Sequence, residues 1–221
     1  MSELFARLDW AGILFAGFDT LTMLSASLLF TVLLGLPLGV VLFLSGKRQL
    51  LERPKLYGAL SVVVNVVRSL PFIILLIVMI PITVRLVGTS LGVAGSIPPL
   101  VVATTPFFGR LVESALREVD RGVVEAMLAA GATIRQIVLW ALLPEALPGI
   151  LAAVTVTAIT LVSYSAMSGV VGGGGLGDLA VRFGYQRFRT DVMIVTVLLL
   201  LILVQALQMI GDRLVHHFSR T

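Results

Sequence analysis

Residues 20–44 read TLTMLSASLLFTVLLGLPLGVVLFL, an unbroken run without a charged side chain. A helix needs about 20 mostly apolar residues to cross the hydrocarbon core of a bilayer, so this run is long enough to span it. Four further runs have the same character, at about residues 59–80, 97–116, 147–165 and 192–210. The sequence therefore predicts an all-α integral membrane protein with five transmembrane helices.

The composition of the whole chain agrees with this prediction. Of the 221 residues, 58% are hydrophobic and 13% are charged, and the mean hydropathy is +1.07. A soluble domain carries about 25% charged residues, and a soluble monomer exposes apolar patches of only a few hundred Å². These values exclude a soluble enzyme, a disordered tail and a fibrous protein. They make the lipid bilayer the expected partner of the apolar surface, and no nucleic-acid partner is expected despite the net charge of +4.

The distribution of basic residues predicts the orientation, because Lys and Arg concentrate in cytoplasmic loops. The larger group lies on one side of the predicted spans: Lys47, Arg48, Arg53, Lys55, Arg110, Arg117, Arg121, Arg135, Arg213 and Arg220. The smaller group lies on the other side: Arg7, Arg85, Arg182, Arg187 and Arg189. This bias places the N-terminus outside and the C-terminus in the cytoplasm. Residues 1–19 mix apolar side chains with scattered charges, which predicts a short interfacial helix with Trp10 near the headgroups.

No linker, charge block or internal repeat divides the chain, which predicts a single transmembrane domain over residues 1–221. The longest polar excursion is the predicted cytoplasmic segment at about residues 117–146. Within it, residues 125–130 are good helix formers and Gly131 stops the run. A second helical run is predicted from Thr133 to Leu143, ahead of a proline.

Two interpretations of this helix–glycine–helix segment stay open. It is either a connector that lies on the surface or a docking site for a cytoplasmic partner. The second interpretation rests on Glu125, which offers an acceptor for an arginine or a backbone N–H. It also rests on small residues that permit close approach of another surface: Ala126, Ala129, Ala130, Gly131 and Ala132.

The same segment resembles the EAA loop of ABC-importer permeases, whose pattern is E-A-A, three residues, G, nine residues, I-x-L-P. The matching residues are Glu125, Ala126, Gly131, Leu143 and Pro144. Met127 and Ala141 depart from the pattern, and both keep their positions apolar. Further segments resemble one subfamily, the permeases of methionine-type ABC importers: residues 68–81, 106–119, 142–149 and 161–180.

This resemblance implies a type I ABC-importer permease fold in the inner membrane of a bacterial cell. It implies a symmetric pair of copies, two cytoplasmic ABC ATPase subunits and an external substrate-binding lipoprotein as partners. ATP and Mg are then bound by the ATPase, and this chain holds no cofactor. The implied coupling residues are Glu125, Ala126, Met127, Ala130, Gly131 and Ala132. The implied substrate is methionine, with another amino acid or a dipeptide as the alternative.

Polar residues within the predicted spans are candidates for the translocation path. Arg68 lies about ten residues into the second span, where an arginine costs at least about 2.5–3.5 kcal/mol. Both a role in holding the bundle together and a role in the path stay open, and Pro71 predicts a bend nearby. Tyr164, Met167 and Ser168 are spaced i, i+3 and i+4, as on one face of a helix. They predict a gate near the two-fold axis, and packing between helices is the alternative.

The sequence offers no signature of catalysis or metal binding. Residues 172–177 satisfy G-x-G-x-x-G, but they follow a membrane helix rather than a strand, so we expect a tight turn instead of a dinucleotide site. There is no P-loop and no H-E-x-x-H, and the absence of cysteine excludes thiolate ligands. We expect no catalytic residue and no metal site. An ion-coupled secondary transporter is disfavoured because neither internal repeats nor intramembrane carboxylates stand out. A membrane-embedded enzyme is disfavoured because no span contains an H-E-x-x-H motif, a nucleophile elbow or an acidic cluster.

Overall fold

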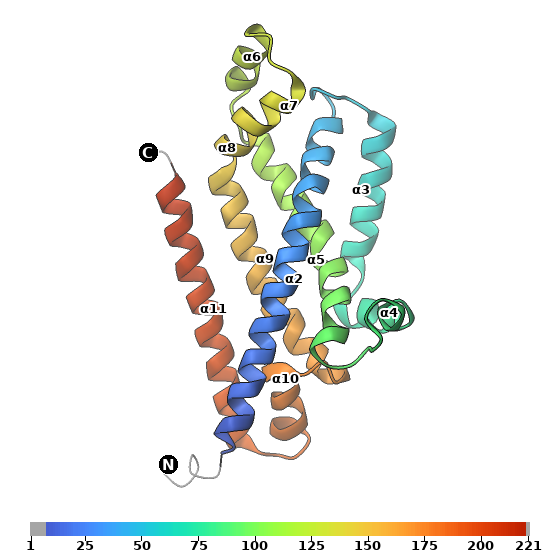
Figure 1. The fold of residues 1–221 in the computed structure, drawn as a ribbon, viewed down its shortest axis with the longest axis vertical. Coiled ribbons are helices and arrows are strands. Elements are labelled where there is room, and N and C mark those ends of the chain that lie inside the picture. The colour runs from blue at the N-terminus through green and yellow to red at the C-terminus, as the bar shows by residue number, and fades with distance from the viewer. Residues whose placement is uncertain (1–7, 220–221) are drawn as a thin grey trace. The chain divides into compact units, whose positions relative to one another are not determined.

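The computed structural model describes residues 8–219, and every regular element in that range is helical (Figure 1). The long helices are α2 (Trp10–Ser45), α5 (Gly92–Arg117), α9 (Leu147–Ser168) and α11 (Thr190–Phe218). The shorter elements are α3 (Pro54–Ser69), α4 (Phe72–Val87), α6 (Arg121–Ala129), α7 (Ile134–Ile137), η1 (Val138–Leu142), α8 (Leu143–Glu145), η2 (Gly169–Val171), α10 (Gly175–Leu179) and η3 (Ala180–Tyr185). The prediction of an all-α protein is confirmed.

Among residues 8–219, four helices are long and apolar enough to cross a membrane, namely α2, α5, α9 with η2, and α11. Helices α3 and α4 pass the same test only as a bent pair, which would make a fifth span. The second predicted span is therefore wrong as one continuous helix, because the chain leaves the helix at Leu70 and Pro71. Proline lacks an N–H and disfavours the α conformation in the residue before it. Pro71 itself is extended, with φ of −57° and ψ of 133°, and stands at the N-cap of α4.

Helix α2 begins earlier than the first predicted span. The Asp9 carboxylate accepts a hydrogen bond from the Gly12 N–H at 3.0 Å, as an N-cap residue does. From Trp10 the helix then runs through Asp19 without a break. Residues 10–19 are thus continuous with the first span and do not form a separate interfacial helix. Residues 1–7 of that prediction lie outside the described range.

The contacts of the chain group into two compact units, and the chain passes from one to the other within α2, α5, α9 and α11 and at the break between α3 and α4. Unit 1 comprises residues 1–30, 70–104 and 158–208, and unit 2 comprises 31–69, 105–157 and 209–221. Core clusters of unit 1 contain Met23, Leu100, Leu161, Ile13 and Val192. The core cluster of unit 2 contains Phe108, Val112, Leu116, Ile137 and Leu142. A single domain over residues 1–221 stays a prediction.

Candidate functional site

Helix α6 presents the residues that were predicted to meet a partner. Its N-terminus is capped by Asp120, whose Oδ1 accepts a hydrogen bond from the Gly122 N–H at 2.6 Å. Glu125 and Ala126 are exposed on this helix, whereas Met127 is half-buried against the core of unit 2. Ala130 follows α6 as an exposed residue, and Ala132 is again half-buried. The predicted coupling residues thus lie together on one short segment with a free face and a packed face.

Gly131 ends this segment in a left-handed conformation with φ of 77°. The Gly131 N–H donates to the Leu128 carbonyl oxygen at 2.9 Å, and the Ala132 N–H donates to the Met127 carbonyl oxygen at 3.0 Å. These two bonds form a Schellman motif, in which glycine avoids the Cβ penalty of the left-handed region. Nothing in the described chain lies within 4 Å of the position that a Cβ would take. The predicted stop at Gly131 is confirmed, and its cause is backbone conformation rather than lack of space.

The second helical run begins as predicted but continues past its expected end. Thr133 and Gln136 form a capping box, since the Thr133 N–H donates to Gln136 Oε1 at 2.8 Å and the Gln136 N–H donates to Thr133 Oγ1 at 3.4 Å. The helix then widens to the π-helix η1, in which the Leu143 N–H donates to the Val138 carbonyl oxygen. A wider turn accommodates Pro144, which has no N–H and would clash with the carbonyl four residues before it. The predicted end before Pro144 is therefore wrong.

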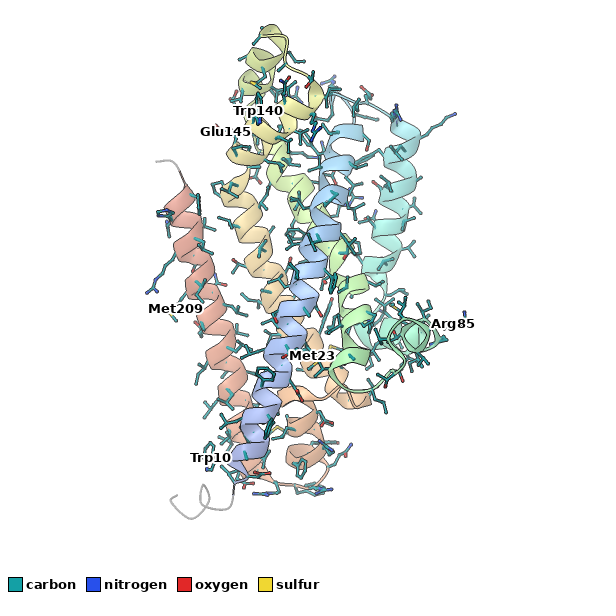
Figure 2. All side chains as sticks on the ribbon, viewed as in Figure 1. Trp10, Met23, Arg85, Trp140, Glu145 and Met209 are labelled. Atoms are coloured by element: carbon teal, nitrogen blue, oxygen red, sulfur yellow. The ribbon has the colours of Figure 1, made fainter. Side chains whose placement is uncertain are left out.

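The run is anchored by apolar side chains. Ile137 and Leu142 are buried with exposed fractions of 0% and 1%, in the same cluster as Phe108 and Leu116 of α5. Trp140 in η1 is exposed (Figure 2). A cavity of about 340 Å³ lies in unit 2 between α6 and the ends of α2 and α5, and its charged lining residues are Arg48, Arg117, Arg121 and Glu125. The helix–glycine–helix segment is thus held firmly at its second half, while α6 borders open space.

A buried carboxylate near the end of α5 was overlooked in the sequence. Glu113 is 3% exposed, and its carboxylate lies 2.6 Å from Nη1 of Arg110 and 2.7 Å from Nη2 of Arg117. The Tyr57 hydroxyl of α3 donates to Glu113 Oε1 at 3.1 Å, and Arg110 also donates to Asn65 at 3.4 Å. A span therefore does contain an acidic residue, contrary to the sequence analysis. The sequence does contain a signal for this cluster, because Glu113 lies three residues after Arg110 and four residues before Arg117.

Arg68 lies in the last turn of α3, directly before the break, and its side chain is exposed. Its guanidinium carbon is 5.7 Å from the centre of the Phe107 ring, which is a cation–π contact within unit 2. The break in the predicted second span therefore puts Arg68 at a helix end. A role of Arg68 in the translocation path stays a prediction.

The predicted gate residues lie at the end of α9 in unit 1. The Tyr164 ring stacks on the Phe72 ring of α4, with centroids 4.5 Å apart and planes 5° from parallel. Met167 is 39% exposed, whereas Ser168 is buried and its hydroxyl donates to the Ser165 carbonyl oxygen at 2.7 Å. Arg68 belongs to unit 2, whereas these three residues belong to unit 1.

The glycine run after α9 makes the tight turn that was predicted. Gly172, Gly174 and Gly175 have positive φ values of 81°, 80° and 76°. The chain then packs α10 against the end of α9, where a Cβ on Gly177 would lie 2.5 Å from the Ala166 carbonyl oxygen. The Leu176 N–H donates to the Thr20 hydroxyl of α2 at 2.9 Å. Glycine is required here for backbone conformation and for close approach.

The family described as the inner membrane component of binding-protein-dependent transport systems matches residues 32–221. The probable D-methionine transport system permease protein MetI of Vibrio cholerae is 51% identical over 92% of this chain and 90% of its own length. The methionine import system permease protein MetP of Bacillus subtilis is 44% identical over 78% of both chains.

Solved structures agree with these relatives. A chain from the inward-facing conformations of the MetNI methionine ABC transporter superposes with a TM-score of 0.92 at 48% identity. That match covers 94% of this chain and 97% of the other.

Proposed function

Since the chain belongs to the family of inner membrane components of binding-protein-dependent transport systems, we propose that it is the transmembrane permease subunit of an ATP-driven ABC importer for methionine. The observation that carries this proposal is the 51% identity, over 92% of the chain, to a D-methionine transport permease. The resemblance to methionine-type permeases, inferred from the motifs, is confirmed at the level of the family. Like its relatives, the chain is a transport component rather than an enzyme.

The proposed assembly contains two copies of this chain, with the translocation path on the two-fold axis. The fold is of the type I importer class in a bacterial inner membrane, with the N-terminus outside and the C-terminus in the cytoplasm. Two ATPase subunits bind ATP and Mg on the cytoplasmic side. An external substrate-binding lipoprotein delivers methionine. The distribution of Lys and Arg supports this orientation.

The proposed contact with the ATPase is α6 together with the Schellman turn, from Glu125 to Ala132. Three features support this role. Glu125 and Ala126 are exposed, small side chains allow close approach, and the second half of the segment is fixed by the buried Ile137 and Leu142. A rigid anchor beside a free helix suits a part that must transmit a displacement from one subunit to another.

The test is ATP-driven methionine uptake in proteoliposomes that contain the permease, its ATPase and its binding protein. Gly131→Trp adds bulk where the chain itself leaves open space, so the permease should fold and the contact with the ATPase should fail. We expect at least a tenfold loss of uptake, equivalent to about 1.4 kcal/mol of coupling. Gly131→Ala carries the same backbone strain without the bulk and should retain most uptake.

A matched control is Gly88→Trp at the C-cap of α4, where φ is 81° and a Cβ would also meet nothing within 4 Å. It imposes the same kind of strain far along the chain from α6 and should leave coupling intact. Normal ATP-driven uptake by Gly131→Trp would contradict the proposed contact. Uptake of another amino acid in preference to methionine would contradict the proposed substrate but not the coupling.

A further inference from the structure

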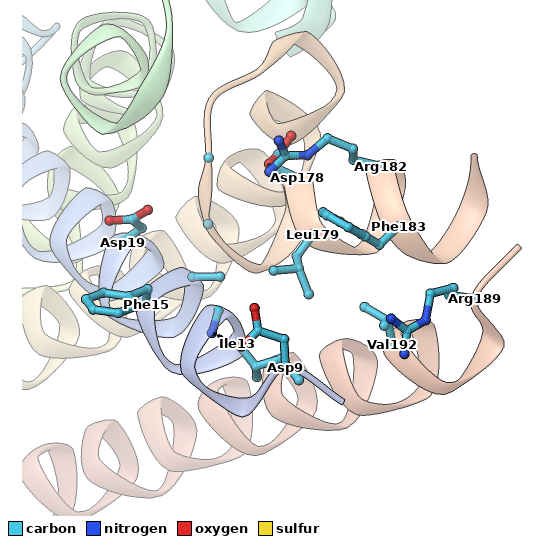
Figure 3. A pocket seen from close by; sticks show the side chains of 14 residues that line it. Asp9, Ile13, Phe15, Asp19, Asp178, Leu179, Arg182, Phe183, Arg189 and Val192 are labelled. Atoms are coloured by element: carbon cyan, nitrogen blue, oxygen red, sulfur yellow. Dashed lines mark hydrogen bonds and ion pairs between the residues drawn. The ribbon is translucent and has the colours of Figure 1, made fainter. Parts of the chain in front are cut away.

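The two ends of α2 carry pockets that differ in charge. The pocket at the N-terminal end, in unit 1, has a volume of about 330 Å³, and its basic lining residues are Arg182 and Arg189 (Figure 3). Arg182 donates to Asp178 at 2.6 Å, and Arg189 donates to Asp191 at 2.6 Å. Each basic side chain of this pocket therefore already has an acidic partner. The pocket at the C-terminal end of α2, in unit 2, has an arginine without one.

This second pocket has a volume of about 150 Å³ and lies where the chain turns from α2 into α3. Apart from Ser45 and Arg53, its lining is apolar and consists of Val41, Leu44, Leu51 and Leu56. Val41 and Leu51 are each 41% exposed, and Leu56 is 40% exposed. The uncharged run of α2 ends directly before Lys47, so the pocket lies where the hydrocarbon core gives way to the headgroups.

Backbone hydrogen bonds hold the loop that forms one wall of this pocket. The Leu51 N–H donates to the Leu44 carbonyl oxygen at 3.1 Å, and the Arg53 N–H donates to the Ser45 carbonyl oxygen at 3.1 Å. Both carbonyls belong to the last turn of α2, where no partner is available within the helix. The loop thus completes the hydrogen bonding of the helix end, and in return α2 fixes the backbone position of Leu51 and Arg53.

The same loop has an excess of positive charge. Its basic residues are Lys47, Arg48, Arg53 and Lys55, and its one acidic residue is Glu52. Among residues 8–219, none of the four basic side chains forms an ion pair. Glu52 Oε2 instead accepts from the backbone N–H of Arg48 at 3.1 Å. A cluster of about four to eight Lys and Arg next to a membrane span attracts anionic lipids.

The N-terminus of α3 adds to this positive charge. A helix N-terminus carries a partial positive charge, which acidic residues stabilise and basic residues oppose. The first turn of α3 contains no acidic residue, and it contains Lys55. Arg53 stands directly before the helix, and both side chains are exposed. An anion from outside the chain would therefore stabilise the helix end and the two basic residues at once.

We propose that this pocket binds an anionic phospholipid of the phosphatidylglycerol class. The phosphate accepts from the Arg53 guanidinium, and the first part of an acyl chain lies against Leu51 and Leu56. The other basic residues of the loop supply attraction at longer range. The exposed apolar lining at the end of a span fits a lipid rather than a free phosphate. A zwitterionic headgroup would bring an ammonium into this positive region, so the site selects anionic lipids, whatever substrate the protein transports.

The test is native mass spectrometry of the full-length chain, purified with its partner subunits and stripped of lipid. It is titrated with phosphatidylglycerol and with phosphatidylcholine of identical acyl chains. We expect phosphatidylglycerol to bind about tenfold more tightly, as the attraction of one or two basic residues allows. Arg53→Gln should abolish most of that preference. Leu51→Gln puts a polar group on the apolar wall and should weaken the binding of both lipids.

The matched control is Arg213→Gln, which removes an exposed arginine in the last turns of α11, away from the lining of this pocket. It should leave the preference unchanged. A further arm adds sn-glycerol 3-phosphate as a phosphate without acyl chains, which should not displace the lipid at equal concentration.

Equal binding of the two phospholipids by the unmodified protein would overturn the proposal, and this arm needs no variant. An Arg53→Gln protein that keeps the full preference would also overturn it, as would an equal loss in Arg213→Gln, because the attraction would then not depend on this pocket. Displacement by glycerol 3-phosphate would show a site for free phosphates instead of a lipid. Failure of methionine uptake bears on the proposed function alone and leaves this measurement unaffected.

Discussion

Met167 and Ser168 are neighbours in α9, yet 39% of Met167 is exposed while Ser168 is fully buried. The Ser168 hydroxyl bonds within its own helix, and a Cβ on Gly173 would lie 2.6 Å from it. The predicted gate residues lie at the same helix end but differ in their exposure to solvent. Of the three, Met167 and the half-buried Tyr164 are the ones that a partner subunit or water can reach.

Cysteine at position 167 should therefore react and cysteine at position 168 should not. The chain has no native cysteine, so single thiols can be measured without background. We expect Met167→Cys to be modified by a water-soluble thiol reagent and to crosslink to its symmetry mate under oxidation, with a yield that changes when ATP is added. Ser168→Cys is the matched control one residue away. If position 167 neither crosslinks nor reacts in any nucleotide state, it is a packing residue.

Glu113 should contribute to stability more than its position near a helix end suggests. Glu113→Ala leaves Arg110 and Arg117 without their shared carboxylate, and breaking a buried ion pair costs about 3–5 kcal/mol. Because Arg117 is partly exposed, with 40% of its side chain accessible, we expect a loss of about 2 kcal/mol. Thermal unfolding in detergent measures it. The control is Glu118→Ala, which removes an exposed carboxylate nearby and should change the free energy of unfolding by less than about 0.5 kcal/mol. Equal melting temperatures for the two variants would refute the role of Glu113.

Two glycines of unit 1 should respond in opposite directions to alanine. In Gly177→Ala the new Cβ meets the Ala166 backbone at 2.5 Å, so the contact between α10 and α9 must open, at a cost of about 1–3 kcal/mol. In Gly17→Ala the Cβ meets nothing within 4 Å among residues 8–219. Since Gly17 lies inside α2, alanine should stabilise that helix by about 0.5–1 kcal/mol. A melting temperature of Gly177→Ala equal to or above that of the unmodified protein would show that the packing of the glycine run does not require Gly177.

Arg68 should face water rather than lipid in the assembled transporter. An unpaired charge in hydrocarbon is costly, and its contact in the structure is a ring face rather than a carboxylate. We expect Arg68→Cys to be modified by a membrane-impermeant thiol reagent. Val66→Cys is the comparison, since Val66 is 57% exposed two residues earlier in α3 and should face lipid. Modification of position 66 but not position 68 would place Arg68 against the hydrocarbon.

Hydropathy was sufficient to locate the long helices, because apolar length is a strong signal in a membrane protein. Proline located the break near residue 71, although a proline inside a span predicts a bend and the chain instead forms two helices. The start of α2 differs from the prediction, because the scattered charges of residues 1–19 predict an interfacial helix rather than part of a span. Asp9 instead caps α2, and Asp19 lies within it.

The coupling segment shows where local rules hold and where tertiary contacts outweigh them. The stop at Gly131 and the start at Thr133 follow from backbone conformation and capping, which are local. The passage through Pro144 depends on the burial of Ile137 and Leu142, which anchors the segment, and on the wider turn of η1, which accommodates the proline. A sequence pattern indicates backbone conformation and capping, but it does not indicate which side chains are buried by tertiary contacts.

The ion pairs around Glu113 also bear on how the protein is made. On one helix, Glu113 lies three residues after Arg110 and four residues before Arg117. Helix α5 therefore carries the counter-ions of its buried carboxylate with it as it leaves the ribosome. Its integration from the translocon into the bilayer need not wait for a charged residue on another segment. The Tyr57 hydroxyl and the Asn65 amide, both from α3, are already synthesised by then and can join the cluster once the helices meet.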